Sequence, residues 1–227
     1  MKKHSVLVVI PAKARSTRIP GKNLKDLCGK PMMAYIIETA KSARGVDRVV
    51  VTTESEEIKR VAEQYGAEVP FIRPQELTAD TATSQEVLVH ALDALKAQEG
   101  YEPDYVLLLY PTSPLLSRER IEQAIALAIE KDADSVVSGH HDKGHYWTED
   151  SDAWKRLYPI ELVNSQYQKP LFKENGAMYL TRSSVLRKQL LADRTQVLIM
   201  DPDENVDVDY PEDFARVEKI LLGKGKA

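Results

Sequence analysis

The sequence predicts an α/β fold with a mostly parallel sheet and helices on both faces. Short apolar runs rich in β-branched residues, such as "SVLVVIP", are typical of strands buried on both faces. Between these runs lie longer segments with apolar residues at helical spacing. The two patterns alternate with a period of about 25–30 residues, which is the period of a βα unit. Such units are joined by right-handed crossovers, and ligands bind beyond the carboxyl ends of their strands.

Each element follows from a local pattern. The runs that predict strands are, in chain order, 5–11, 48–53, a weaker run at 68–72, 105–110, 134–138, 175–181 and 196–200. The segments that predict helices are 31–43, 56–65, 84–98, 118–131 and 211–222. Ser55 and Ser117 are suited to cap two of these helices, and Pro31 and Pro211 suit a first helical turn. We therefore expect one domain over residues 1–227.

Composition bounds the function. The chain has 227 residues and is 43% hydrophobic, which suffices for one large core. The net charge of -4 argues against a general binder of nucleic acid or membranes. No apolar run approaches the roughly 20 residues of a membrane span, and the first run, 6–10, is too short for a signal peptide. The single cysteine, Cys28, excludes an intramolecular disulfide, so we expect a cytoplasmic protein in a reducing compartment.

A basic loop follows the first expected strand. Residues 11–30 contain one acid, Asp26, and six basic residues: Lys13, Arg15, Arg18, Lys22, Lys25 and Lys30. The loop lies at the carboxyl end of its strand, where Gly21 permits close approach and backbone N–H groups can form an anion nest. A solvated charged loop is the alternative. Position and composition together favour phosphate binding, although the P-loop motif is absent.

An acidic segment near the other end of the chain is the counterpart of this loop. Residues 200–213 contain seven acids and no base. Asp207 and Asp209 are separated by one residue, so on an extended segment both carboxylates point the same way. Two carboxylates suit Mg²⁺, which keeps water ligands and takes phosphate oxygens. A solvated acidic turn is the alternative, but basic loop and acidic pair in one domain favour a metal that bridges to phosphates.

The regular alternation stops between residues 140 and 172. This segment has no clean period and holds six of the fifteen aromatic residues: Tyr146, Trp147, Trp154, Tyr158, Tyr167 and Phe172. Long irregular segments in compact domains are usually functional or interfacial, so we expect a small insertion with such a role. His140, His141 and His145 lack the cysteine or carboxylate that would complete a zinc site. We interpret His90 and Cys28 as packing residues.

Several stretches together resemble one enzyme family. They are "IPAKARSTRIPGKNLKDLCGKPMMAYIIETA", "DRVVVTTESEEIKRVAEQYGAEVPFIRPQELTADTATS", "LLLYPTSP", "SVVS", "ENGAMYL" and "VDVDYPEDF". Their order and spacing resemble those of the acylneuraminate cytidylyltransferases, or CMP-sialic acid synthetases, over nearly the whole chain. The resemblance implies a Rossmann-like, GT-A-like nucleotidyltransferase fold. It also implies a reaction in which CTP and a nonulosonic acid give a CMP-sugar and pyrophosphate with Mg²⁺.

The resemblance assigns roles to individual positions. In the family's pattern the phosphate-binding positions are those of Lys13, Arg15, Ser16, Lys22 and Asn23, with Lys13 and Lys22 counted as catalytic. Ala82, Thr83 and Ser84 match the segment around the base, and Asn175 matches an asparagine near nucleotide and sugar. Asp207 and Asp209 match the metal aspartates, and Asp209 is the residue expected to help activate the sugar hydroxyl.

The sequence also departs from this pattern. Lys13 replaces a usual arginine, and Arg15 and Arg18 stand at positions that are commonly glycine. Tyr110 replaces a glutamine that faces the sugar in the family. Residues 140–172 fall where relatives carry a dimerisation element that completes the partner's sugar pocket, which implies a homodimer in which Lys169 or Lys173 meets the sugar carboxylate.

The changes leave the substrate open. Legionaminic, pseudaminic or a deaminated nonulosonic acid, or Kdo, are alternatives to sialic acid, and so is a base other than cytosine. Two alternatives come from other classes: a GT-A-type glycosyltransferase that uses Asp207 and Asp209 as its metal motif, and a non-catalytic nucleotide-sensing module.

Overall fold

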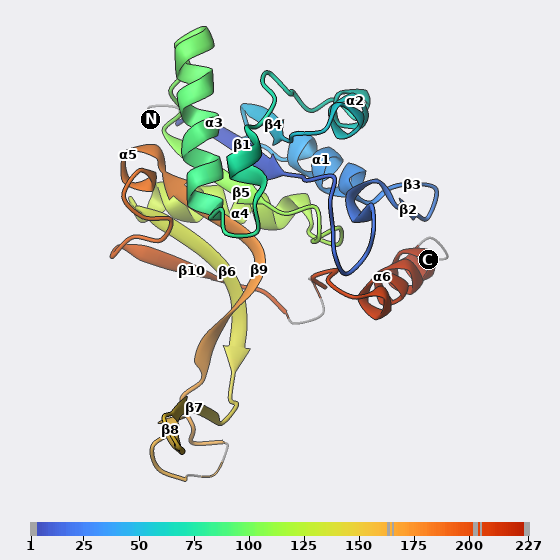
Figure 1. Ribbon diagram of the computed structural model, residues 1–227. Coiled ribbons are helices and arrows are strands. Elements are labelled where there is room, and N and C mark those ends of the chain that lie inside the picture. The colour runs from blue at the N-terminus through green and yellow to red at the C-terminus, as the bar shows by residue number, and fades with distance from the viewer. Residues whose placement is uncertain (1–3, 163, 165, 202–203, 205, 225–227) are drawn as a thin grey trace.

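The computed structural model describes residues 4–162, 164, 166–201, 204 and 206–224. Its core is a six-stranded sheet with the strand order β10-β6-β9-β5-β1-β4 (Figure 1). The strands are β1 (Val6–Pro11), β4 (Arg48–Thr52), β5 (Tyr105–Leu109), β6 (Ser135–Asp142), β9 (Leu171–Arg182) and β10 (Thr195–Ile199). Two short pairs lie outside this sheet: β2 (Asp26–Leu27) with β3 (Lys30–Pro31), and β7 (Tyr146–Asp150) with β8 (Ala153–Tyr158).

Helices cover both faces of the sheet, which confirms the expected fold class. On one face α1 (Met32–Ser42), α2 (Glu56–Gln64) and α4 (Arg118–Glu130) pack against alternate residues of β1 and its neighbours. On the other face α3 (Ser84–Glu99) and the short α5 (Ser183–Leu186) pack against the residues between them. Leu7, Val8 and Val9 are fully buried, because each successive side chain meets a helical layer.

The strand directions refine the expectation of a mostly parallel sheet. β1 pairs in parallel with β4 and β5, and β10 pairs in parallel with β6. β9 is antiparallel to both β5 and β6. The weak strand expected at 68–72 is wrong: Glu68 makes one isolated bridge with Val50, and no strand follows. Pro70 has no N–H to donate to a ladder, which accounts for the early end.

Residues 140–172 form an arm that projects from the sheet (Figure 1). β6 and β9 continue past the sheet as an antiparallel pair, with His140 opposite Lys173 and Asp142 opposite Leu171. The β7–β8 hairpin lies at the tip of this arm. The segment is thus more regular than its sequence suggested, although Val163 and Ser165 lie outside the described residues.

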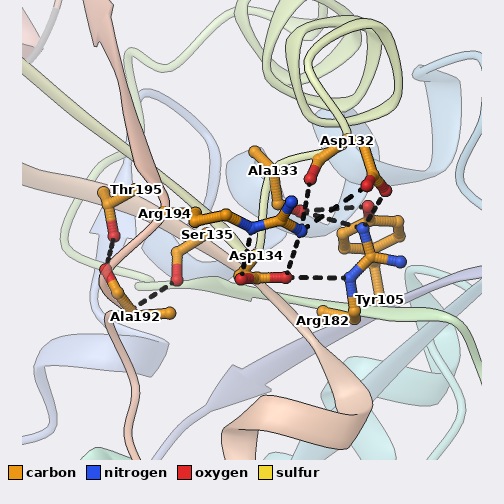
Figure 2. Close-up of polar contacts among 9 residues, drawn as sticks. All are labelled: Tyr105, Asp132, Ala133, Asp134, Ser135, Arg182, Ala192, Arg194 and Thr195. Atoms are coloured by element: carbon orange, nitrogen blue, oxygen red, sulfur yellow. Dashed lines mark hydrogen bonds and ion pairs between the residues drawn. The ribbon is translucent and has the colours of Figure 1, made fainter.

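Ion pairs close the edge of the sheet at which the parallel strands begin (Figure 2). Arg182, at the end of antiparallel β9, donates to Asp132 at 2.7 Å, and Arg194 donates to Asp134 at 2.9 Å. The Arg182 guanidinium also lies 4.9 Å from the centre of the Tyr105 ring. These ion pairs tie the starts of the parallel strands together at this edge of the sheet.

Candidate functional site

A cleft of about 480 Å³ lies at the carboxyl edge of the sheet. The chain goes from β1 outward to β4 on one side and later to β5 on the other, so the strand order reverses at β1. In open α/β sheets such a reversal is where ligands bind. The walls of the cleft come from the basic loop after β1, from residues 77–84, and from Tyr110, Pro111 and Thr112 after β5.

The basic loop is held in shape by its own backbone and one amide. Gly21 adopts a left-handed conformation with φ of 63°, and a short 3₁₀ helix, η1 (Lys22–Leu24), follows it. Asn23 is buried, and its Nδ2 donates to the carbonyl of Lys13 at 2.9 Å. This bond ties the end of the loop to its start. Lys13, Arg15, Ser16, Lys22 and Asn23, all expected to bind phosphate, line the cleft together.

The two long walls of the cleft are joined by an ion pair. Lys13 Nζ lies 2.6 Å from Asp80 Oδ1, on the segment that follows the 3₁₀ helix η2 (Gln75–Thr78). The hydrogen bond from Lys13, and then its charge, lower the pKa of Asp80. Both side chains are exposed enough for water to screen the pair, so a phosphate can compete for Lys13.

The expected base-binding segment splits into capping and lining residues. Thr83 is the N-cap of α3 in a capping box: its hydroxyl accepts from Glu86 N at 3.2 Å, and its N–H donates to the Glu86 carboxylate at 2.7 Å. Its side chain is therefore engaged in starting the helix. Ala82 and Ser84 line the cleft, and Ser84 Oγ lies 2.6 Å from the Tyr110 hydroxyl. Tyr110 thus lines the same cleft.

Arg73 is a lining residue that the sequence analysis missed. It is 4% exposed and lines the cleft, with Nη2 3.0 Å from Glu54 Oε2. Burial lowers the pKa of this guanidinium, and Glu54 opposes that shift. Glu54 also accepts from the N–H of Ala14, so this ion pair supports the basic loop from below. The Nε of Arg73 has no hydrogen-bond partner among the described residues. The signal in the sequence was a lone arginine before Pro74.

The acidic pair is brought to the basic loop by the burial of the valines that alternate with the two acids. Val206 and Val208 lie in a small apolar cluster with Ile19 and Leu27, covered by α6 (Pro211–Lys224). Alternation along an extended segment directs Asp207 and Asp209 away from that cluster. Asp203 of the same acidic segment lies outside the described residues.

Asp209 is held by two cations of the basic loop. Its Oδ1 lies 3.3 Å from Lys22 Nζ, and its Oδ2 lies 3.0 Å from Arg18 Nη1. Lys22 Nζ also donates to the carbonyl of Val208 at 2.6 Å. The Arg18 guanidinium lies 5.2 Å from the centre of the Tyr210 ring. Lys22 and Asp209, 187 residues apart in sequence, therefore meet at one end of the cleft. Arg18 and Lys22 line the cleft there, and Asp207 and Asp209 lie behind them, outside its lining.

Asp207 lies beside Asp209 with fewer compensating charges. Burial raises the pKa of Asp207, and the negative charge of Asp209 adds to that shift, while a hydrogen bond from Thr112 and the charge of Lys22 oppose it. Two neighbouring carboxylates, one of them buried, are suited to a hard cation. Among the described residues, no group of three or more acidic, histidine or cysteine side chains is placed to hold a metal. The pair would thus leave coordination positions for water and substrate oxygens.

Asn175 lies where the arm leaves the sheet. Its Oδ1 accepts from Ser138 Oγ at 2.7 Å and from Ala177 N at 3.1 Å. Gly176 adopts a φ of 69°, and a Cβ at this position would come 3.6 Å from Asp207 Oδ2. Asn175 therefore shapes the backbone next to Asp207, and it does not line the nucleotide cleft.

The two lysines expected to meet the sugar lie on the arm. Lys173 Nζ is 3.9 Å from Asp142 Oδ2, and the carbonyl of Lys169 accepts from the Tyr158 hydroxyl. Neither residue lines the cleft of its own chain. Among the described residues, no helix combines the length and apolar character needed to cross a bilayer.

A basic loop at the sheet reversal, opposed by two carboxylates, defines a protein that handles nucleoside phosphates. Residues 7–224 match the cytidylyltransferase family, and the chain belongs to this family of nucleotidyltransferase enzymes. It is 32% identical over 223 residues to the CMP-N,N'-diacetyllegionaminic acid synthase of Legionella pneumophila, covering 95% of this chain and 96% of that protein. It is 35% identical over 185 residues to the pseudaminic acid cytidylyltransferase of Campylobacter jejuni, covering 80% of this chain and 72% of that protein.

A solved structure shows the same fold. A CMP:2-keto-3-deoxy-manno-octonic acid synthetase, solved in complex with CTP, matches with a TM-score of 0.73 at 20% identity. The match covers 97% of this chain and 99% of that chain. The mixed, mostly parallel sheet is thus the fold of known nucleotidyltransferases.

Proposed function

We propose that the protein transfers CMP from CTP to an acidic nine-carbon sugar, a nonulosonic acid, and releases pyrophosphate. The observation that carries the proposal is the meeting of Lys22 and Arg18 with Asp207 and Asp209 at one end of the cleft. It is supported by the relatives named for legionaminic and pseudaminic acids and by the related synthetase solved with CTP.

The nucleotide would lie along the cleft, with the base towards Ala82 and Ser84 and the phosphates on the basic loop. Lys22 and Lys13 supply mobile positive charge for the phosphates. The expected nest of backbone donors after Gly21 does not form, because the N–H groups of Lys22, Leu24 and Lys25 donate to carbonyls of the loop itself. Arg73 is a further candidate for the nucleotide, because it is buried, lines the same cleft and keeps an unpartnered Nε.

Mg²⁺ would be held by Asp207 and Asp209 together with phosphate oxygens and water, and when bound it would offset charge on the phosphates. In the reaction, the anomeric hydroxyl oxygen of the sugar forms a bond to the α-phosphorus. The bond from that phosphorus to the bridging oxygen breaks, and pyrophosphate leaves with the electron pair, while the proton of the attacking hydroxyl passes to water. Asp209 is the candidate for orienting the attacking hydroxyl, because it already lies beside Lys22.

A homodimer is part of this proposal. The arm of one chain exposes large apolar side chains that its own sheet does not cover: Trp147, Trp154, Leu157, Ile160, Leu162 and Tyr167. An isolated two-stranded hairpin is marginally stable, and clustered apolar surface of this kind is typical of an interface. In a dimer built on the arms, Lys169 and Lys173 could supply charge for the sugar carboxylate in the partner's cleft.

A pyrophosphate-release assay tests the function. Four nucleoside triphosphates are combined with sialic, legionaminic, pseudaminic and deaminated nonulosonic acids and with Kdo. We expect release that requires both CTP and one nonulosonic acid. If Kdo were the only sugar that supports release, the substrate would be an eight-carbon acidic sugar. Nucleotide binding without release for any pair would favour a sensing module, and consumption of a CMP-sugar without pyrophosphate would favour a glycosyltransferase.

A further inference from the structure

A chain of aromatic and polar contacts leads from the cleft to an acidic side chain on β9. The Tyr110 hydroxyl meets Ser84 at 2.6 Å, and the Tyr110 ring meets the Tyr179 ring edge-on, with centroids 6.4 Å apart. The Tyr179 hydroxyl donates to Glu174 Oε2 at 2.9 Å. Tyr110 and Tyr179 pack against the α3 side of the core, so Tyr179 has a fixed surface behind it. Tyr179 therefore orients the Glu174 carboxylate.

This chain of contacts lies beside the proposed metal carboxylates. Burial raises the pKa of both Tyr110 and Tyr179, and the charge of Asp207 adds a smaller contribution to each. Gly176, between Glu174 and Tyr179 in sequence, is the residue whose added Cβ would come 3.6 Å from Asp207. In-line attack at the α-phosphorus must come from the side opposite the departing pyrophosphate. With the phosphates on the basic loop, the sugar would enter along the Tyr110–Tyr179 side.

Among the described residues of its own chain, Glu174 has no cation to neutralise the negative charge that it gives to that side. It is exposed, and among the described residues no lysine, arginine or histidine lies within ion-pair distance of it. The neighbouring Lys173 is directed to Asp142. The acceptor sugar carries a carboxylate of its own, and like charges placed side by side are disfavoured. The sugar carboxylate should then point away from Glu174. A substituent of the sugar that carries a nitrogen donor is the group that suits the Glu174 carboxylate best.

We infer that Glu174, oriented by Tyr179, selects an acceptor sugar that carries a cationic nitrogen substituent, an amine or an amidine, over the same sugar with a neutral amide. This inference rests on the proposed function. An amidinium and a carboxylate can form two parallel, charge-assisted hydrogen bonds, whereas a neutral amide offers one weaker N–H. Covering by the bound sugar removes water from the pair and strengthens the preference.

A matched pair of substrates isolates the charge. The same nonulosonic acid is prepared with an acetamido and with an acetamidino group, which are nearly identical in shape, and kcat/KM is measured for each with CTP. We expect the wild type to prefer the amidino sugar by about 10- to 100-fold. Glu174→Gln should bring that ratio close to one, and Tyr179→Phe should lower it in part because Glu174 is no longer oriented. Glu130→Gln, which removes an exposed carboxylate on α4, is the control and should leave the ratio unchanged.

The outcomes distinguish failure of the inference about Glu174 from failure of the proposed cytidylyltransferase function. A wild-type ratio near one, or a ratio that Glu174→Gln leaves unchanged, overturns the inference while the cytidylyltransferase proposal stands. An equal fall in kcat/KM for both sugars also overturns it, because a merely structural role would act on both alike. A wild type that turns over neither these sugars nor any other acceptor overturns the proposed function and the inference together.

Discussion

Replacing Lys22 by methionine should weaken CTP binding and leave the fold in place. The Lys22 side chain is 12% exposed, and its Nζ already has two acceptors, Val208 O at 2.6 Å and Asp209 Oδ1 at 3.3 Å. Methionine keeps most of the apolar stem and removes only the charge and the donors. The substitution therefore tests the ammonium group and disturbs little of the packing around it.

The size of the effect follows from those contacts. A charge-assisted hydrogen bond to phosphate contributes roughly 1.5–3 kcal/mol, which corresponds to about 10- to 150-fold in affinity. Because Lys22 must give up part of its contact with Asp209 to bind phosphate, we expect the lower end, about 10- to 30-fold. Val208 O loses its donor in the variant, so the free energy of unfolding should fall by about 1 kcal/mol, a shift in Tm of roughly 2–4 °C.

Isothermal titration of CTP in the absence of sugar measures the affinity, and circular dichroism during heating measures the Tm. Lys25→Met is the matched control: Lys25 belongs to the same loop and is exposed, but it lies 5.0 Å from the Phe214 ring and does not line the cleft. Its affinity for CTP should stay within about twofold of the wild type. Normal affinity in a folded Lys22→Met, or an equal loss in Lys25→Met, would refute the phosphate-binding role.

Three further predictions test the metal, the dimer and the aromatic wall. Asp209→Asn should reduce pyrophosphate release by orders of magnitude and raise the Mg²⁺ concentration needed for half-maximal rate; full activity of chelated wild type would show that the acids are only a solvated turn. Light scattering should give twice the 25.6 kDa chain mass, and Trp154→Ser should shift it towards one chain mass; an active wild-type monomer would contradict the arm-built dimer. Tyr110→Phe loses the hydrogen bond with Ser84 and should raise KM for the sugar more than KM for CTP; an effect on CTP alone would place Tyr110 at the base.

The strands of the core could be predicted because burial on both faces leaves a plain signal. β1 and β5 are continuous apolar runs, and the structure buries almost every residue of each. The direction of a strand leaves no such signal in the sequence. An antiparallel strand between two others has the same composition as a parallel one when helices cover both faces of the sheet. β9 is antiparallel since the chain leaves along β6 through the arm and returns directly beside it, as in a long hairpin. The irregular pattern of residues 140–172 reflects that arm, most of whose large apolar side chains are not covered within one chain.

In the candidate site too, features set by a short segment of sequence could be predicted, and features set by contacts between distant residues could not. The basic loop and the acidic pair were visible because each concentrates one kind of charge in a short segment. Arg73 was missed because a single arginine has no pattern, and its place in the cleft depends on Glu54, 19 residues away in sequence. Thr83 was grouped with the base-binding residues, yet its hydroxyl caps α3. The spacing of Thr83 and Glu86 is the sequence signature of a capping box, so this role was readable from local pattern.

The position of the acidic pair is set by burial more than by charge. Val208 is fully buried and Val206 is 5% exposed, in a cluster that also takes Ile19 from the basic loop. Burying two valines contributes roughly 3–6 kcal/mol, whereas two partly exposed ion pairs to Asp209 contribute about 1 kcal/mol each at most. The carboxylates are therefore carried to the loop by the apolar residues that alternate with them. The ion pairs of Asp209 with Arg18 and Lys22 are weak enough for the proposed cation and phosphates to replace.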